Sequence, residues 1–494
     1  MDIIITGNKN IVDAIAAKAS KKPRNAKGTK GDEKPSAQEA FVPSIFRYVQ
    51  PTPNGALVYQ TLTNAFVRLT KMELEKLEGR RPIGKALAKQ LAAQGLFVPA
   101  GLDERKGYCD MARTMRKRPR PYLSLNITTT LACNARCTYC YEKGVPQRAF
   151  DRSMIPKLLA FLRDHLPKDG TLRINWFGGE PLLGTEIIDE ITTALTKEGV
   201  AFSSYIITNG SRLTKRLIDQ KFQRWNVGDV QITLDGLAKT YEARKQYQDQ
   251  KAGIFSRILK KIETVAHAGV NVHIRLNIDR GNMEEVLELI ELLEKRYGTL
   301  DKVTWYPAFL TGIGSDLTCD EKIAFVRKMF ERMKNPTKMN VAQRMFAMPR
   351  IMSCMRYDQQ SYSIDVSGRV YRCEHEVGRE EFAIGRLSPF SFDDRGRTTI
   401  RLSKECKECV FLPKCLGGCA SDKAAGDAPC LIERYMIQGY LAFMAEKEGA
   451  VFDEEARNAE SDPASGESSG ETVRNHRTTG TSHRNPRRRK PART

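Results

Sequence analysis

Cysteine is the residue type in this sequence whose placement most clearly indicates chemistry. The chain holds 12 cysteines in 494 residues, and most of them fall in two dense groups. No apolar stretch is long enough for a signal peptide or a membrane span, so we expect a cytoplasmic protein. The cytosol keeps thiols reduced, and clustered cysteines there favour metal ligands over disulfides.

The first group has the spacing C-x3-C-x2-C and consists of Cys133, Cys137 and Cys140. It follows directly after a predicted strand. Three thiolates on one short loop can bind three irons of a four-iron cluster, which leaves one iron open to a further ligand. Buried or zinc-binding cysteines are the alternative, but structural zinc sites usually have four ligands. The spacing therefore favours an iron–sulfur cluster.

The second group contains seven cysteines between residues 354 and 430. Two of them bracket Gly368 as C-x13-G-x4-C, four more follow as C-x2-C-x5-C-x3-C, and the last comes ten residues later. A zinc site on part of this pattern is the alternative to further iron–sulfur clusters. The seven are Cys354, Cys373, Cys406, Cys409, Cys415, Cys419 and Cys430.

Extended apolar segments alternate with helical periodicity from residue 122 onward. Six β-α units in succession need crossover helices and therefore a parallel sheet. We predict an α/β fold, a partial (β/α)6 barrel rather than a closed eightfold one, with functional groups at the C-terminal ends of the strands. The predicted strands are Tyr122–Ile127, Leu172–Phe177, Ser203–Thr208, Val230–Leu234, Val270–Ile278 and Val303–Phe309.

Composition divides the chain into five segments. Residues 1–40 and 451–494 are polar, and we expect both to be disordered, the second as a basic tail. Residues 41–110 predict a small α+β module that could bind a peptide. Residues 111–335 hold the barrel, and residues 336–450 form a C-terminal, cysteine-rich, cluster-binding domain.

The first cysteine group and its surroundings resemble the radical S-adenosylmethionine (SAM) superfamily over about residues 121–310. An aromatic residue, Tyr139, precedes the last cysteine, and the second predicted strand ends in W-F-G-G-E-P, which is similar to the family's GGEP motif. Glycines there let backbone carbonyls approach an ammonium closely. The resemblance implies that the amino group of the SAM methionine is bound by Gly178, Gly179, Glu180 and Pro181.

Two later strand ends extend this resemblance. Asn209 ends the third predicted strand, and Thr233 lies in T-L-D-G at the end of the fourth. In relatives these positions contact the ribose and carboxylate of SAM, so the resemblance implies that both residues, with Tyr139, bind the cofactor. Each could instead be a plain turn residue at a strand end.

The second cysteine group closely resembles the SPASM extension of radical SAM enzymes that modify peptides and proteins. That resemblance implies two auxiliary four-iron clusters. The inner one would be held by Cys354, Cys373 and Cys419, which leaves its fourth ligand open or supplied from elsewhere, for example by Cys319. Cys319 and Cys109 otherwise read as ordinary thiols. The outer cluster would be held by Cys406, Cys409, Cys415 and Cys430.

Glu374 directly follows a predicted ligand, Cys373. In sulfatase-maturing relatives an aspartate at this position acts as the base on the substrate side chain. A carboxylate near a cluster could accept a proton while an electron leaves. The alternative is a surface glutamate in a loop.

The resemblance implies reductive cleavage of SAM to a 5′-deoxyadenosyl radical and oxidative modification, as a crosslink, of a ribosomally made peptide. The alternatives are anaerobic sulfatase maturation, which makes formylglycine, and a cluster-binding electron-transfer or scaffold protein. The partners implied are a precursor peptide or protein and an electron donor such as flavodoxin or ferredoxin. The net charge of +21 suits either a solvated surface or an acidic peptide, and no nucleic-acid motif accompanies it.

Overall fold

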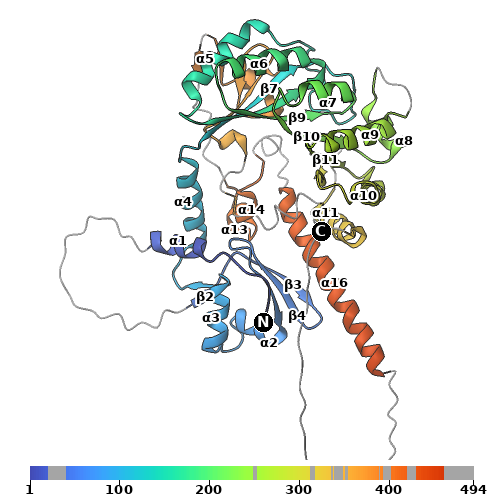
Figure 1. Cartoon of the computed structure of the whole chain (residues 1–494). Helices are drawn as coiled ribbons and strands as arrows, with labels where there is room; N and C mark the ends of the chain where they lie inside the picture. Colours follow the sequence, from blue (N-terminus) through green and yellow to red (C-terminus); the bar gives the residue numbers. More distant parts are fainter. Residues whose placement is uncertain are drawn as a thin grey trace, which may run out of the picture. The chain divides into compact units, whose positions relative to one another are not determined.

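Figure 1 shows the computed structural model of the chain. It describes residues 1–19, 41–248, 253–311, 317–334, 338, 349–350, 354–388, 390–392, 402–419 and 430–460. The chain divides into two units, Met1–Gly449 and Ala450–Thr494. Within the described residues, no helix is long and apolar enough to cross a membrane.

A parallel sheet of six strands forms the centre of the first unit, with strand order β12-β11-β10-β9-β8-β7. The predicted α/β partial barrel is confirmed, and each predicted strand overlaps an observed one. The strands are β7 (Tyr122–Thr130), β8 (Thr171–Gly178), β9 (Phe202–Thr208), β10 (Val227–Leu234), β11 (Asn271–Ile278) and β12 (Val303–Phe309).

Side chains alternate across this sheet, because successive residues of a strand point to opposite faces. On β7, Leu123, Leu125 and Ile127 are fully buried in the main hydrophobic core, whereas Ser124 and Asn126 face a cavity. The helices that follow the strands line the outside of the sheet (Figure 1). They are α5 (Ile155–His165), α6 (Thr185–Lys197), α7 (Lys215–Lys221), α8 (Ala238–Lys245), α9 (Ile254–His267), α10 (Met283–Tyr297) and α11 (Cys319–Arg332).

The C-terminal cysteine-rich part extends the barrel sheet from its other edge. Strand β13 (Ser361–Ile364) pairs in parallel with β7, and three antiparallel strands continue from it to give a ten-stranded sheet. This pairing brings the segment with Cys373 and Glu374 beside β7. The remaining elements are η4 (Met355–Tyr357), β14 (Arg369–Tyr371), η5 (Glu374–Glu376), η6 (Glu380–Phe382), β15 (Gly385–Leu387), β16 (Phe390–Phe392), α13 (Lys404–Glu408), α14 (Leu412–Cys415) and α16 (Ile432–Glu460).

The N-terminal part is a mixed α+β module. Its four-stranded sheet has the order β1-β5-β4-β3, and β2 and β6 form a separate pair. The elements are β1 (Asp2–Ile5), α1 (Asn10–Ala19), β2 (Phe41–Pro43), β3 (Arg47–Thr52), β4 (Gly55–Gln60), β5 (Phe66–Thr70), α2 (Lys71–Leu77), α3 (Lys85–Ala93), β6 (Phe97–Pro99) and α4 (Glu104–Arg116).

Both chain ends that we predict to be disordered contain regular elements within the described residues. The first nineteen residues form β1 and α1, because Ile11 and Ile15 share one face of α1 and are buried. At the other end, α16 continues to Glu460. Residues 20–40 and 461–494 lie outside the described residues.

The N-terminal module packs directly onto the segment that carries the later cysteines. Leu412 and Leu416 are buried in one hydrophobic cluster with Phe46, Leu62 and Tyr108 of the module. The Tyr108 hydroxyl also donates to the Arg350 carbonyl oxygen at 2.6 Å. The module therefore supports the last cysteine segment through apolar packing and hydrogen bonds.

Glu104 fastens the start of α4 to the loop before β3. It is 3% exposed, and its carboxylate accepts hydrogen bonds from Ser44 Oγ at 2.7 Å and Ile45 N at 2.8 Å. We expect Glu104→Ala to lower the free energy of unfolding by about 2 kcal/mol, because two donors lose their acceptor. Thermal unfolding of the metal-free chain measures this. Glu288→Ala, at an exposed position of α10, is the control. Equal melting temperatures for both variants would contradict the assignment.

Candidate functional site

The loop with Cys133, Cys137 and Cys140 follows β7 and is held by backbone groups of other elements. Helix α8 ends beside it, and the carbonyl oxygens of Arg244 and Lys245 accept from Thr138 N at 3.1 Å and Arg136 N at 3.0 Å. Carbonyls in the last turn of a helix have no partner within the helix. The loop therefore satisfies the end of α8 while α8 fixes the path of the loop.

The three thiols of this loop are neighbours in a desolvated setting. Burial is the main cause that raises the pKa of Cys133 to about 12; the charges of Glu180, Cys137 and Cys140 contribute to this rise, and a hydrogen bond from Ala135 N opposes it. Burial likewise raises the pKa of Cys140. Thiolates are the form that binds metal, so these sulfurs need a cationic centre to ionise. The donor set, three thiols on one loop, fits three corners of a four-iron cluster.

A single metal ion is a poorer fit. Nowhere in the described residues do three Cys, His, Asp or Glu side chains converge as ligands of one ion. A four-iron cluster takes one thiolate for each iron, so its ligand sulfurs are spread around a larger body.

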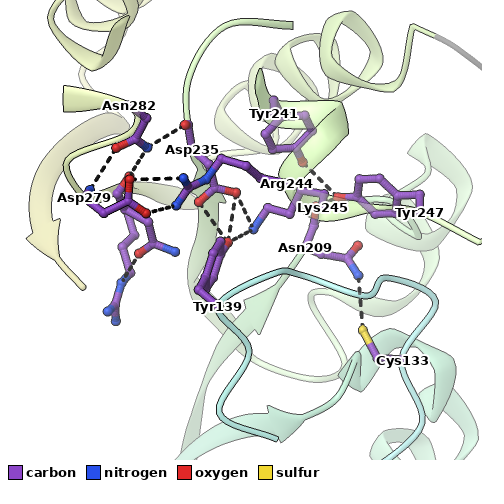
Figure 2. A network of polar contacts seen from close by, with 12 residues as sticks. Cys133, Tyr139, Asn209, Asp235, Tyr241, Arg244, Lys245, Tyr247, Asp279 and Asn282 are labelled. Atoms are coloured by element: carbon purple, nitrogen blue, oxygen red, sulfur yellow. Dashed lines mark hydrogen bonds and ion pairs between the residues drawn. The ribbon is translucent and has the colours of Figure 1, made fainter. Parts of the chain in front are cut away.

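Tyr139 lies in a buried polar network at the end of β10, shown in Figure 2. Its hydroxyl contacts both carboxylate oxygens of Asp235, at 2.8 and 2.9 Å, and accepts from Lys245 Nζ at 2.7 Å. The Lys245 ammonium and the Asp235 carboxylate are 3.1 Å apart, with side-chain exposures of 4% and 0%. Burial is the largest single influence and would lower the pKa of Lys245, but the charges of Asp235, Tyr139, Cys137 and Tyr241 together raise the pKa. This ion pair anchors the aromatic ring that precedes Cys140.

The same network ties neighbouring strand ends together (Figure 2). Arg244 donates to both carboxylate oxygens of Asp279, which follows β11, at 2.6 and 3.2 Å. Asn282 Nδ2 donates to the backbone carbonyl oxygen of Asp235 at 2.7 Å. Two parallel, charge-assisted bonds from an arginine fix geometry as well as adding energy. The ends of β10 and β11 and helix α8 are thus one rigid frame for the loop.

The two glycines of the G-G-E-P segment lie against the cysteine loop. Gly178 has φ +123, and a Cβ there would lie 2.1 Å from the Thr130 carbonyl oxygen. A Cβ on Gly179 would lie 2.5 Å from the Ala132 carbonyl oxygen. Only glycine tolerates both approaches. Pro181, the last residue of this segment, begins the short helix η2 (Pro181–Leu183).

Glu180 makes its hydrogen bonds within the protein. It is fully buried, and its carboxylate accepts from Thr208 Oγ1 at 2.7 Å, Asn209 N at 2.8 Å and Leu182 N at 3.1 Å. Burial raises the pKa of Glu180, against these hydrogen bonds. The side chain joins the end of β8 to the end of β9, so any contact with a ligand adds to a structural role.

Asn209 and Thr233 both lie at the C-terminal edge of the sheet. Asn209 Nδ2 lies 4.0 Å from Cys133 Sγ (Figure 2). It also donates to Asn134 Oδ1 at 2.9 Å, and the Asn209 carbonyl oxygen accepts from the Tyr247 hydroxyl at 3.0 Å. Thr233 is half-buried on β10 beside Arg275 of β11. Asn209 therefore touches the cysteine loop, whereas Thr233 faces the barrel interior.

A cavity of about 320 Å³ lies where the C-terminal part meets β7. Cys354, Cys373 and Cys419 line it together with Glu374 and Asn126. Burial raises the pKa of Cys373 to about 12, and the charge of Cys354 contributes. Three cysteines that are distant in sequence therefore border one cavity.

Glu374 faces the barrel. Its Oε2 accepts from Asn126 Nδ2 at 2.9 Å, and Asn126 Oδ1 in turn accepts from Asn175 Nδ2 at 2.7 Å. Asn126 is only 3% exposed. The two asparagines, on β7 and β8, hold the carboxylate at the cavity wall.

A stacked ring pair joins the two cysteine regions. Tyr141, just after the first cysteine loop, stacks on His375 with ring centroids 4.4 Å apart and planes at 11°. Because His375 follows Glu374, this contact links the cavity to the first loop.

The four remaining cysteines of the second sequence group, Cys406, Cys409, Cys415 and Cys430, form a third group. Burial raises the pKa of Cys415 to about 11, and the charges of Cys409, Cys430 and Cys406 add to the rise. Burial also raises the pKa of Cys409, with contributions from Cys430 and Cys406. Four thiols gathered around Cys415 fit the four corners of a cluster.

The two remaining cysteines lie outside these three groups. Cys319 Sγ is 3.6 Å from the Tyr435 hydroxyl on α16, which gives no support to Cys319 as a ligand beside Cys354 and Cys373. Cys109 is half-buried on α4 against the cluster of Leu412 and Leu416. Burial raises the pKa of Cys109, as expected of an inert thiol.

The chain is similar in sequence to known radical SAM proteins. Residues 127–293 match the family model described as the radical SAM superfamily. The probable GTP 3′,8-cyclase of Methanothermobacter thermautotrophicus is 31% identical over 211 residues, which cover 40% of this chain and 67% of that protein. The Fe-coproporphyrin III synthase of Methanosarcina barkeri is 25% identical over 223 residues, 44% of this chain and about half (53%) of that protein. The chain belongs to the radical SAM superfamily, whose enzymes bind a four-iron cluster and SAM.

The solved structures show the same fold. The protein anSMEcpe with bound AdoMet has a TM-score of 0.52 and 16% identity, with 68% of this chain and 95% of that chain covered. A form of it bound to AdoMet and a peptide has a TM-score of 0.51 and 17% identity, with 69% and 100% covered.

The sequence alone did not indicate the residues that position Tyr139 and Glu374. Asp235 lies in T-L-D-G, but the sequence alone indicates no role for it. Lys245, Asn126 and Asn175 carried no signal, because a lone lysine on a helix or asparagine on a strand has many uses. Their roles depend on partners far away in the sequence.

Lys245 provides a test of this frame. We expect Lys245→Met to cost about 3–5 kcal/mol of stability, because it leaves the Asp235 carboxylate buried without a cation. Thermal unfolding and the iron retained after anaerobic reconstitution measure the effect. The double variant Lys245→Met/Asp235→Asn removes the stranded charge and should be more stable than the single variant. The reverse order would contradict the ion-pair assignment.

Proposed function

We propose that this enzyme oxidatively modifies a ribosomally made peptide, with one SAM-binding cluster and two auxiliary clusters. The observation that carries the proposal is the meeting of Glu374 with Cys354, Cys373 and Cys419 at one cavity beside β7. A titratable group and a set of soft metal ligands in one cavity are the parts that an oxidation of a substrate carbon requires.

Ten cysteines would hold the clusters in three sets. Cys133, Cys137 and Cys140 would hold the first cluster, with SAM on the open iron. When bound, the first cluster and SAM supply a 5′-deoxyadenosyl radical that removes a hydrogen atom from substrate. The inner auxiliary set would be Cys354, Cys373 and Cys419, and the outer set Cys406, Cys409, Cys415 and Cys430.

Side chains of the protein would then orient the cofactor and accept a proton from the substrate. Tyr139, held by Asp235 and Lys245, would present its ring to the cofactor, and Asn209 would fix the loop near Cys133. Gly178, Gly179 and Pro181 would leave room for the methionine end of SAM, with Thr233 on the neighbouring barrel wall. Glu374 Oε1 or Oε2 would accept the proton as the substrate loses an electron to the inner set.

A peptide substrate is favoured by the extra N-terminal module. Its sheet ends at β3, and in an antiparallel sheet every second residue of an edge strand turns its backbone groups outward. Such an edge can bind an extended peptide as an added strand. A low-potential electron carrier such as flavodoxin or ferredoxin would reduce the first cluster. Formylglycine formation on a protein substrate would use the same cavity. Analysis of the product distinguishes it from peptide crosslinking.

Iron content tests the three cysteine sets. We expect about twelve irons per chain after anaerobic reconstitution, from three four-iron clusters. Replacing Cys133, Cys137 and Cys140 by alanine should remove about a third of the iron and all SAM cleavage. Replacing Cys109 and Cys319 by alanine is the matched control and should change neither. About four irons with bound zinc in the unaltered chain would refute the auxiliary clusters.

Glu374→Gln tests the proposed base. The amide keeps the shape and the Asn126 contact but cannot accept the proton. We expect SAM cleavage to continue while modification of the peptide falls by about a hundredfold or more. The assay weighs peptides from short reading frames beside the gene after co-expression, where oxidative crosslinking removes two hydrogens. Glu381→Gln, exposed on η6, is the control. Unchanged modification by Glu374→Gln would exclude it as the base.

A further inference from the structure

Arg434 makes a direct contact with one thiol of the outer set. It lies one helical turn after Cys430, near the start of α16, and its Nη1 donates to Cys430 Sγ at 3.0 Å. Its Nε donates to Gln438 Oε1 at 3.1 Å, and its guanidinium carbon is 5.7 Å from the centroid of the Phe411 ring. Three neighbours therefore hold the guanidinium in one position.

Arg434 lies beside both chain segments that carry the outer cysteine set. Phe411 lies between Cys409 and Cys415 in sequence, and its backbone N donates to Cys409 Sγ at 3.4 Å. Arg434 thus bridges the end of the chain that carries Cys430 and the segment that carries the other three thiols. Arginine stays charged at all working pH values, so this donor is permanent.

For Cys354 and Cys373 of the inner set, the difference lies in the hydrogen-bond donors and not in a lack of positive charge, because Arg350 and Arg356 act electrostatically on Cys354. Cys354 accepts backbone hydrogen bonds from Arg356 and Tyr357, and Cys373 accepts one from His375. These donors are neutral amides. Hydrogen bonds to cluster sulfurs and nearby charge set the reduction potential of iron–sulfur clusters. A cationic donor stabilises the reduced state, which carries one more negative charge, better than a neutral donor does.

We propose that Arg434 raises the reduction potential of the outer auxiliary cluster, so that electrons leaving the substrate collect there. The inference rests on the proposed function, because it needs Cys406, Cys409, Cys415 and Cys430 to hold a cluster. Arg434 is a tuning residue that acts through Cys430 and does not touch the substrate.

The experiment is a redox titration followed by electron paramagnetic resonance on the full chain. Cys133, Cys137 and Cys140 are replaced by alanine so that only the auxiliary clusters contribute. Arg434→Met removes the donor and the charge, Arg434→Lys keeps the charge without the planar fork, and Lys447→Met removes one exposed charge from the same helix. Cys430→Ala identifies the signal that belongs to the outer cluster.

We expect the outer-cluster midpoint to move to a more negative potential in Arg434→Met and by less in Arg434→Lys, with no shift in Lys447→Met. The inner-cluster midpoint should stay unchanged in all three. An unchanged outer midpoint in Arg434→Met with full iron content overturns the inference. If Arg434→Met loses its outer-cluster iron, Arg434→Lys decides, since a negative shift supports the inference and an unchanged midpoint overturns it.

Different results would refute the auxiliary-cluster assignment and the role of Arg434. A chain with an intact second cysteine group that shows no auxiliary-cluster signal refutes the cluster assignment before any Arg434 variant is made. If both auxiliary-cluster signals are present and their midpoints do not change in the Arg434 variants, the cluster assignment stands. Only the proposed effect of Arg434 on the reduction potential is then refuted.

Discussion

The placement of the first cysteine loop is the constraint on which the rest of the site depends. A loop with three half-buried thiols needs support from the rest of the fold, because its backbone groups are polar and partly desolvated. The loop is fixed by the carbonyl end of α8, by the tight approach of Gly178 and Gly179, and by the Lys245–Asp235 pair behind Tyr139. The glycines come from the end of β8, whereas the other two supports come from the end of β10 and the helix α8 that follows it.

The buried ion pair illustrates how this frame works. Desolvation of Lys245 and Asp235 is costly, and the charges repay it only because they lie 3.1 Å apart and share the Tyr139 hydroxyl. Such a pair adds little net stability but allows one arrangement only. It therefore defines where the ring of Tyr139 stands, which a purely apolar contact would leave less specific.

The C-terminal part of the chain extends the barrel sheet at the edge formed by β7. Because β13 pairs in parallel with β7, the segment after it runs past the open side of the barrel. Glu374 thereby meets Asn126 and the inner cysteines, while the N-terminal module packs against Leu412 and Leu416 between the outer ones. Substrate capture, proton transfer and electron removal would thus occupy adjoining parts of one structure.

Sequence alone determined the barrel, and it predicted which thiols would bind metal. Strand and helix periods are local, and the cysteine spacings within each loop follow from one short stretch of chain. Sequence did not reveal β1, α1 or the strand β13, since short elements depend on what they pack against. Only the tertiary structure decided that Asn126 holds Glu374, that Lys245 and Asp235 hold Tyr139, and that Arg434 reaches Cys430 beside Phe411. These pairings join side chains from separate elements, and a single sequence carries no record of which distant polar groups must satisfy one another.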